Sequence, residues 1–137
     1  MNKILIVDDE EAIQILYAEE LTEEGYKVMT TSDGSRLLEI IGQERPDLIV
    51  LDIVVGEYSG LDLLQDIRST YCNLPVILCT AYSTFKYDLR SIAAAHYVTK
   101  SSDLTELKLK IKMSIKGNRQ FQPRKTLNQV QEMPEYW

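Results

Sequence analysis

A chain of 137 residues, 45% of them hydrophobic and 26% charged, has the size and composition of one folded domain. Its net charge of −6 leaves no basic stripe for a nucleic acid, so direct nucleic-acid binding is not expected. No apolar run approaches the roughly 18 residues of a membrane span, and the acidic start is no signal peptide. Two cysteines fit a reducing compartment, so the sequence predicts a cytoplasmic protein without a membrane partner.

Short apolar or β-branched runs alternate regularly with helix-like segments along the chain. The runs that predict strands are residues 3–7, 26–30, 47–51, 75–79 and 96–99. The first and third of these runs are almost continuously apolar, as expected of strands that are buried on both faces.

Between the strands, apolar residues recur at steps of three and four, the period of a helix with one buried face. These residues are Ile13, Leu16, Tyr17 and Leu21; Leu37, Leu38 and Ile41; Leu61, Leu64 and Ile67; and Leu104, Leu107, Ile111 and Ile115. Residues that favour helix ends bound the segments: Gly25 after the first, Asp33 before the second, Ser59 or Gly60 at the third, and Ser102 or Asp103 at the last. The segment 82–94 has an irregular aromatic pattern and predicts a helix less clearly.

Five strand-then-helix units predict an α/β fold, a doubly wound five-stranded parallel sheet with helices on both faces and right-handed crossovers. In such folds the functional site lies beyond the carboxyl ends of the strands, where the strand order reverses. The residues that follow the strands are therefore the candidates for function.

Four of the predicted strands end in side chains that can do chemistry: Asp8 and Asp9, Asp52, Thr80, and Lys100. Carboxylates that lie close together raise each other's pKa values, and a divalent cation removes the conflict. Hard oxygen ligands suit Mg²⁺. Between a metal and Lys100, Asp52 is placed to attack a phosphoryl group as a nucleophile. Mg²⁺, Lys100 and Thr80 would then stabilise charge on the phosphoryl oxygens.

Over about residues 2–116 the chain resembles the receiver domain of two-component response regulators. The resemblance rests on Asp8-Asp9, Asp52, Thr80-Ala81, and Tyr97 with Lys100, each in the family's order and at nearly its spacing. It implies a flavodoxin-like receiver fold with strand order 2-1-3-4-5. It also implies that Asp52 accepts a phosphoryl group from a sensor histidine kinase or a histidine phosphotransferase. Such a module signals by protein–protein contact and catalyses only its own phosphoryl transfer and dephosphorylation.

The resemblance further implies a magnesium site. In the family, the residue that matches Asp9 binds Mg²⁺ directly, and the residue that matches Asp8 binds it mainly through water. The carboxylate of Asp52 and the backbone carbonyl of Val54 would complete the protein's ligands. Mg²⁺ is therefore the expected cofactor.

Two more roles follow from the same resemblance. Thr80 and Tyr97 would form a switch that remodels the face made by the segment 82–94, the last strand and the last helix. That face is expected to bind a downstream protein target or a second copy of the chain. Val54 and Tyr82 would set the lifetime of the phosphoryl group, and because neither carries an amide or carboxylate to orient water, we expect a long lifetime.

The sequence departs from the family's pattern at three places. Gly56 stands where the family commonly has a proline, so the loop after Asp52 loses a fixed φ angle. Ser101 stands where a proline usually follows the lysine, so a cis bond would cost roughly 2.5–4 kcal/mol there. The stretch from Thr80 to Lys100 is also about two residues short, which affects the expected fourth helix.

Three rival functions remain at this stage. A haloacid-dehalogenase-like phosphatase would need a second aspartate two residues after the nucleophile, but Val54 stands there. An FMN-binding flavodoxin-like protein is disfavoured because the acids from Asp8 to Glu11 would repel a phosphate. A pseudo-receiver that binds partners without phosphorylation is disfavoured by the complete set of acids, threonine and lysine.

The predicted organisation is a receiver domain over residues 1–116 and a tail over 117–137 without an output domain. The tail is rich in glutamine, and its two prolines and weak periodicity are typical of a disordered terminus. Its aromatic residues Tyr136 and Trp137 are expected to dock on the receiver or on a neighbouring copy. The alternative is a passenger segment without a docking role.

Overall fold

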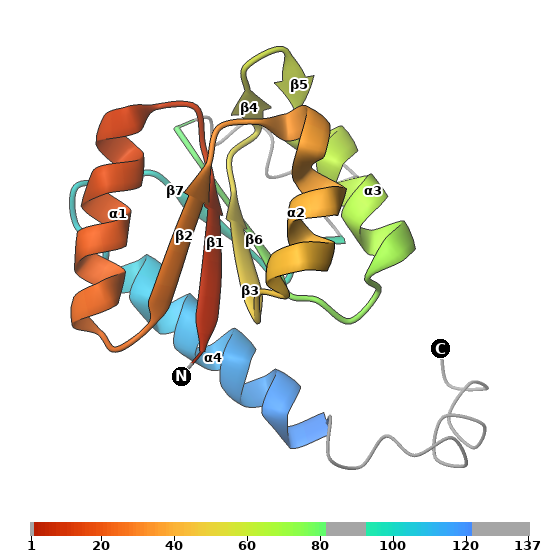
Figure 1. Cartoon of the computed structure of the whole chain (residues 1–137). Helices are drawn as coiled ribbons and strands as arrows, with labels where there is room; N and C mark the ends of the chain where they lie inside the picture. Colours follow the sequence, from red (N-terminus) through yellow and green to blue (C-terminus); the bar gives the residue numbers. More distant parts are fainter. Residues whose placement is uncertain (1, 82–92, 122–137) are drawn as a thin grey trace.

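A computed structural model describes residues 2–81 and 93–121, with side chains up to residue 116. A central sheet lies between two layers of helices, with a small hairpin at one end (Figure 1). In chain order the elements are β1 Lys3–Val7, α1 Glu11–Glu23, β2 Lys27–Thr31, the 3₁₀ turn η1 Gly34–Arg36, α2 Leu37–Glu44, β3 Leu48–Leu51, β4 Val54–Val55, β5 Tyr58–Ser59, α3 Gly60–Thr70, β6 Val76–Thr80, β7 His96–Thr99 and α4 Thr105–Phe121.

The five strands of the central sheet run parallel in the order β2-β1-β3-β6-β7. Counted along the chain within this sheet, the order is 2-1-3-4-5, so the predicted fold class is confirmed. The chain order reverses between β1 and β3, and the carboxyl ends of these two strands therefore flank the expected functional site.

Two apolar cores form because successive residues of a buried strand point to opposite faces of the sheet. Ile4 and Ile6 of β1 join the core under α1 and α4, whereas Leu5 and Val7 join the core under α2 and α3 (Figure 1). Burying a side chain of this size typically contributes about 1.5–3 kcal/mol, so both faces of the sheet hold the fold together.

The predicted helix stripes are confirmed except at one position. Leu37 and Ile41 of α2 are buried, but Leu38 is exposed. The α-helix begins at Leu37, directly after the 3₁₀ turn, and its period turns Leu38 away from the face that Leu37 and Ile41 share. Its inclusion in the predicted stripe was therefore wrong.

Several predicted helix ends have the expected local chemistry. Gly25 follows α1 with a φ of +98°, a conformation that glycine adopts without a steric cost. Asp33 accepts a hydrogen bond from Ser35 N at 2.9 Å, and Asp103 accepts one from Thr105 N at 3.0 Å. Ser59 precedes α3 but makes no capping bond with its side chain.

The loop after Asp52 contains an antiparallel hairpin that the sequence did not predict. Strands β4 and β5 pair Val55 with Tyr58 around Gly56 and Glu57, and Gly56 has a φ of +60°. Tight hairpin turns of this kind favour residues that tolerate positive φ. Gly60 then starts α3 so close to Asp52 that a Cβ at this position would collide with the Asp52 backbone carbonyl.

Residues 82–92 and 122–137 lie outside the described residues. The expectations for the fourth helix, Tyr82, and the docking of Tyr136 and Trp137 therefore stay predictions. Helix α4 continues to Phe121, past the predicted start of the tail at residue 117. Among the described residues no peptide bond is cis, so the link from Lys100 to Ser101 is trans.

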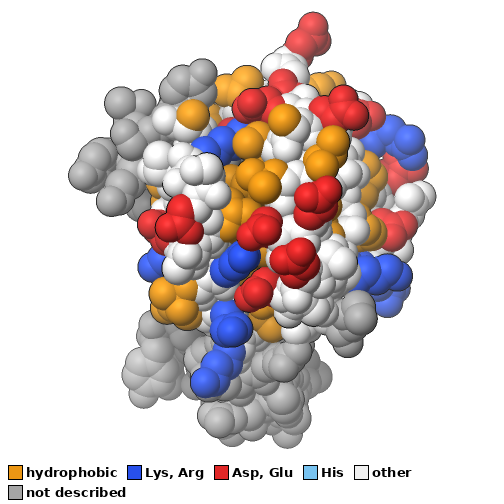
Figure 2. Space-filling model, turned by 90° about the vertical axis from the view of Figure 1, so that its left-hand side faces the viewer, with side chains coloured by type: hydrophobic (Ala, Val, Ile, Leu, Met, Phe, Trp, Pro, Cys, Tyr) orange, Lys and Arg blue, Asp and Glu red, His pale blue; other side chains and the backbone are white. Residues whose placement is uncertain are grey.

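The surface on the side of α1 carries mixed charge. Acidic side chains are spread over the face shown in Figure 2, with basic side chains between them. A salt bridge joins α4 to α1, with Lys108 Nζ 2.9 Å from Glu20 Oε1. Within the described ranges, no helix combines the length and the apolar character needed to cross a membrane.

Arg68 links the end of α3 to the segment that precedes β7. Its Nε and Nη2 atoms donate to the carbonyl of Ala93 at 3.1 and 2.8 Å. Its Nη1 atom donates to Leu74 O at 2.7 Å and to Cys72 O at 3.0 Å. Burial lowers the pKa of the guanidinium, so these carbonyl contacts are what make the half-buried position tolerable.

Replacing Arg68 with methionine should lower the free energy of unfolding by about 1–3 kcal/mol, because partly buried carbonyls lose their donors. Urea denaturation followed by circular dichroism measures this loss. Arg36→Met is the matched control, because Arg36 pairs with Glu39 on the open surface and should contribute less. Equal losses in the two variants would contradict the assigned role of Arg68.

Candidate functional site

The register of the parallel strands brings the predicted site residues to one edge of the sheet. Val7 lies opposite Leu51, so Asp8 and Asp52 emerge side by side from β1 and β3. Thr80 lies opposite Thr99, and Lys100 N donates to Thr80 O at 2.7 Å. The expected convergence at the carboxyl ends of the strands is therefore present in the structure.

The ammonium of Lys100 lies at the centre of this edge. Lys100 Nζ is 2.7 Å from Asp8 Oδ2, 2.9 Å from Asp52 Oδ2 and 3.1 Å from Glu10 Oε1. The side chains of Asp8 and Asp52 are only 4% and 7% exposed, whereas that of Glu10 is 62% exposed. Two buried carboxylates and one exposed carboxylate thus share a single cation.

Burial has opposite consequences for the two ends of the Asp8–Lys100 pair. Burial is the main cause that raises the pKa of the Asp8 carboxyl, and the bonds from Lys100 and Glu10 N offset it only in part. Burial alone would lower the pKa of Lys100, but its bonds to Asp8, Asp52 and Glu10 outweigh this and raise it. We conclude that Lys100 carries its charge in the folded protein, whereas burial disfavours the charged form of Asp8.

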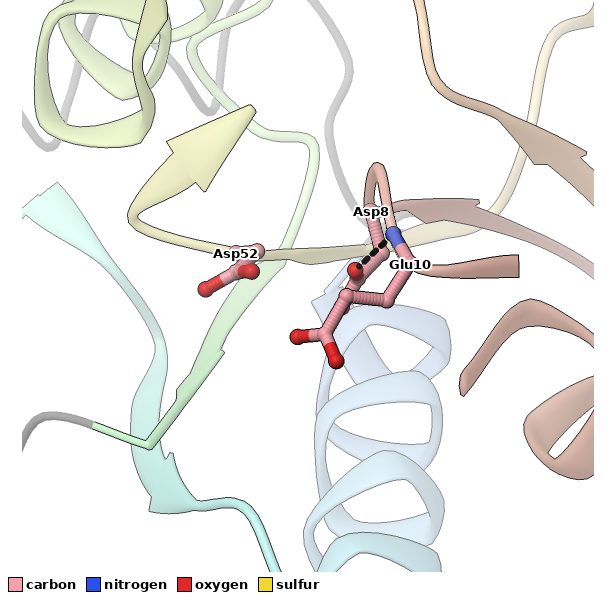
Figure 3. Close-up of side chains that lie close together, drawn as sticks. All are labelled: Asp8, Glu10 and Asp52. Carbon is pink, nitrogen blue, oxygen red and sulfur yellow. Dashed lines mark hydrogen bonds between the residues drawn. The ribbon is translucent and has the colours of Figure 1, made fainter. Parts of the chain in front are cut away.

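Asp9 does not join the other carboxylates. It is exposed, and its Oδ2 atom accepts a hydrogen bond from Gly56 N at 3.1 Å. The acids whose oxygens gather within 4.8 Å of one another are instead Asp8, Glu10 and Asp52 (Figure 3). The structure thus brings together two of the three predicted metal-binding side chains, together with a residue that was not among the predicted ligands.

Sequence reasoning missed Glu10, although two signals pointed to it. Glu10 directly follows Asp8-Asp9 and occupies the position before α1, where Ser, Thr, Asp or Asn is usually found. Its side chain makes no capping bond there. A long acidic side chain without a capping role, next to a strand end, is free to reach a neighbouring cation.

The remaining predicted residues lie around this centre. Thr80 is fully buried at the end of β6, and Tyr97 is half-buried on β7, against the core under α2 and α3. Val54 is exposed at the start of β4, two residues beyond Asp52. Tyr82 falls outside the part of the chain that the structure describes.

The cluster of Asp8, Glu10 and Asp52 fits a small cation by charge and by ligand type. Three carboxylates against one ammonium leave two excess negative charges at the edge of the sheet. Carboxylate oxygens are the ligands that Mg²⁺ prefers, and it usually keeps several waters, so one or two of these carboxylates suffice as direct ligands. The arrangement can hold such an ion and can present the Asp52 carboxylate to an electrophile.

Comparison with known proteins gives a consistent family. Residues 4–112 match the response regulator receiver domain. Sporulation initiation phosphotransferase F of Bacillus subtilis is 32% identical over 121 residues, which cover 85% of this chain and 98% of the relative. The probable transcriptional regulatory protein TcrX of Mycobacterium tuberculosis is 34% identical over 111 residues, 80% of this chain. The chain spans only 47% of the length of TcrX.

Solved structures agree with the sequence relatives. The response regulator TrrA of Thermotoga maritima, crystallised with Mg²⁺-BeF, has a TM-score of 0.80 and 43% identity, covering 83% of this chain and 99% of TrrA. TrrA in complex with the histidine kinase ThkA has a TM-score of 0.78 and 42% identity, and the match covers 83% of this chain and 98% of TrrA.

Replacing Asp8 with asparagine should stabilise the metal-free protein at neutral pH. Below the ordinary pKa of 3.8, Asp8 is protonated in both the folded and unfolded states and resembles asparagine. As the pH rises from 3.8 through the raised folded pKa, the unfolded state loses its proton first and the wild type loses stability. In urea denaturation with EDTA between pH 3 and pH 8, the midpoint of Asp8→Asn should therefore rise further above that of the wild type as the pH increases.

Asp9→Asn is the control for this comparison, because it removes the same charge from an exposed neighbour. Its urea midpoint should follow that of the wild type more closely across the same pH range. A constant difference between Asp8→Asn and the wild type at every pH would show that burial of the Asp8 charge is not the cause.

Proposed function

The chain belongs to the response regulator receiver domain family, and from this premise we propose that it is a switch that accepts a phosphoryl group on Asp52. The observation that carries the proposal is the buried contact of 2.9 Å between Asp52 Oδ2 and Lys100 Nζ, at the carboxyl edge of the sheet. Asp8 is equally buried and also contacts Lys100, so the choice of Asp52 rests on its match to the acceptor position of the family, where Lys100 can neutralise an incoming phosphoryl oxygen.

In the proposed reaction, a carboxylate oxygen of Asp52 forms a bond to phosphorus as the bond to the donor breaks. The leaving group departs with the electron pair of the broken bond, and Lys100 balances charge on the phosphoryl oxygens. The step needs no substrate other than the phosphoryl donor. Val54 offers no carboxylate two residues after the nucleophile, so the general acid of an aspartyl-phosphate phosphatase is lacking at that position.

The residues proposed to hold Mg²⁺ are Asp9, Asp52 and the backbone carbonyl of Val54, with Asp8 acting through water. When bound, the ion would supply positive charge that stabilises the transferring phosphoryl group. In the structure, the Oδ2 atom of Asp9 accepts a hydrogen bond from Gly56 N, so the hairpin holds the carboxylate that is proposed to become a ligand. That TrrA was crystallised with Mg²⁺-BeF supports this choice of ion.

The proposed phosphoryl donor is a sensor histidine kinase or a histidine phosphotransferase in the cytoplasm. The complex of TrrA with ThkA supports a kinase partner. For the output we propose the face of β7 and α4, where Leu109 and Met113 of α4 are exposed, and the expected contribution of the segment 82–94 falls mostly outside the described residues. A downstream protein or a second copy of the chain would bind there.

The proposed switch couples this face to Asp52 through Thr80 and Tyr97. Thr80 is buried at the end of β6, and Tyr97 lies on the neighbouring β7 and is only half-buried. A phosphoryl oxygen on Asp52 would draw the Thr80 hydroxyl toward it. The Tyr97 ring would then fill the space, and the surface formed by β7 and α4 would change shape.

Incubation with acetyl phosphate and Mg²⁺ should add one phosphate to the wild type, because the chain itself supplies the catalytic groups. Intact-mass spectrometry measures the addition, which EDTA should abolish. Asp52→Asn should take up none. Asp66→Asn removes an exposed acid from α3 and should behave as the wild type does. Phosphate on Asp52→Asn would contradict the assignment.

Replacing Val54 with asparagine should speed hydrolysis of the phosphoryl group, because an amide can orient an attacking water and the valine cannot. We expect an increase of about tenfold or more in the dephosphorylation rate. The decay of the phosphorylated mass with time measures the rate. Val54→Ala is the control, since it opens space without adding a polar group. If both variants decay at the wild-type rate, Val54 does not set the lifetime.

A further inference from the structure

Glu10 stands at a position where its side chain would ordinarily cap a helix. The backbone carbonyl of Glu10 accepts bonds from Ile13 N and Gln14 N, each at 3.1 Å, which marks it as the residue that opens α1. Its own N–H donates to Asp8 Oδ1 at 2.9 Å, as the dashed line in Figure 3 shows. The backbone is thus fixed at both ends, while the carboxylate makes no capping bond and extends to Lys100.

The three carboxylates match the three N–H donors of Lys100. An ammonium has three donors and no acceptor. Lys100 Nζ donates hydrogen bonds to Asp52 and Glu10 at 2.9 and 3.1 Å and forms an ion pair with Asp8 at 2.7 Å, so three carboxylates surround the ammonium. While Asp52 keeps its contact, an oxygen of the incoming phosphoryl group can therefore bond to Lys100 only if Asp8 or Glu10 withdraws.

Glu10 is the partner that can withdraw at the lowest cost. Asp8 and Asp52 are almost fully buried, and a buried carboxylate that loses its cation is strongly destabilised. Glu10 is 62% exposed and its contact with Lys100 is the longest of the three, so water can solvate its carboxylate when it leaves. Exposure and distance therefore single out the same residue.

We propose that Glu10 is a positioning residue that occupies the third donor of Lys100 in the resting state and gives it up to an oxygen of the phosphoryl group. This inference rests on the proposed phosphorylation of Asp52. Glu10 keeps Lys100 fully bonded before the reaction, and it has no contact with Lys100 afterwards.

Two rates should respond differently if Glu10 acts in this way. Phosphorylation requires Glu10 to leave Lys100, so weakening that contact should make the reaction faster. Dephosphorylation starts from a state in which Glu10 has already left, so the same change should not affect it. A residue with a merely structural role would not separate the two rates.

The test compares Glu10→Gln with Glu11→Gln in the full chain at constant ionic strength and saturating Mg²⁺. Both variants remove one charge from the start of α1, but Glu11 makes no ion pair with Lys100 in the described structure. We expect Glu10→Gln to be phosphorylated by acetyl phosphate about two to five times faster than Glu11→Gln, the range for an exposed ion pair. The dephosphorylation rates of the two variants should agree within about twofold.

A direct measurement of the Lys100 ammonium accompanies the rates. In the metal-free protein, the ¹H–¹⁵N signal of Lys100 Nζ should shift in Glu10→Gln and stay at the wild-type position in Glu11→Gln. Equal phosphorylation rates in the two variants, or an unmoved Lys100 signal in Glu10→Gln, would overturn the inference while leaving Asp52 phosphorylation in place. A wild type that takes up no phosphate would overturn the proposed function, and the inference with it.

Discussion

The contact of the Lys100 ammonium with carboxylates from two strand ends is the interaction on which the site depends. Asp8 and Asp52 are buried at adjacent positions, and neither charge would be tolerated there without a cation. Removing the lysine would leave two buried carboxylates without a cation, which is costly, so the lysine fixes both carboxylates. The positions of Asp8 and Asp52 at this edge of the sheet therefore depend on Lys100, which directly follows β7.

The loop after Asp52 is held by backbone contacts as much as by side chains. Gly60 lets α3 start against the carbonyl of Asp52, where any Cβ would collide. The hairpin formed by β4 and β5 turns at Gly56, whose N–H bonds to Asp9. A proline in place of Gly56 has no N–H to donate. The metal-free protein therefore links Asp9 to this hairpin.

The pattern of the sequence predicted the sheet because strands that are buried on both faces, such as β1, β3 and β6, are short and almost continuously apolar. The buried faces of the helices were also predicted from the sequence. The exception is Leu38, which the helical period of α2 turns away from the face that Leu37 and Ile41 share. The hairpin was not predicted, since its strands have two residues each and carry no periodic signal. Its only trace in the sequence was Gly56, which is compatible with many loops.

The sequence by itself determined the fold class, the strand order implied by the family's motifs, and the edge at which acids, hydroxyl and lysine meet. These follow from periodicity and from the order of residues at strand ends. Only the tertiary structure decided which acids share the cation, placing Glu10 beside Lys100 and turning Asp9 toward Gly56. That choice depends on side-chain reach, burial and competing backbone donors, which act between segments that are about 90 and 47 residues apart in the chain and leave no periodic signal in the sequence.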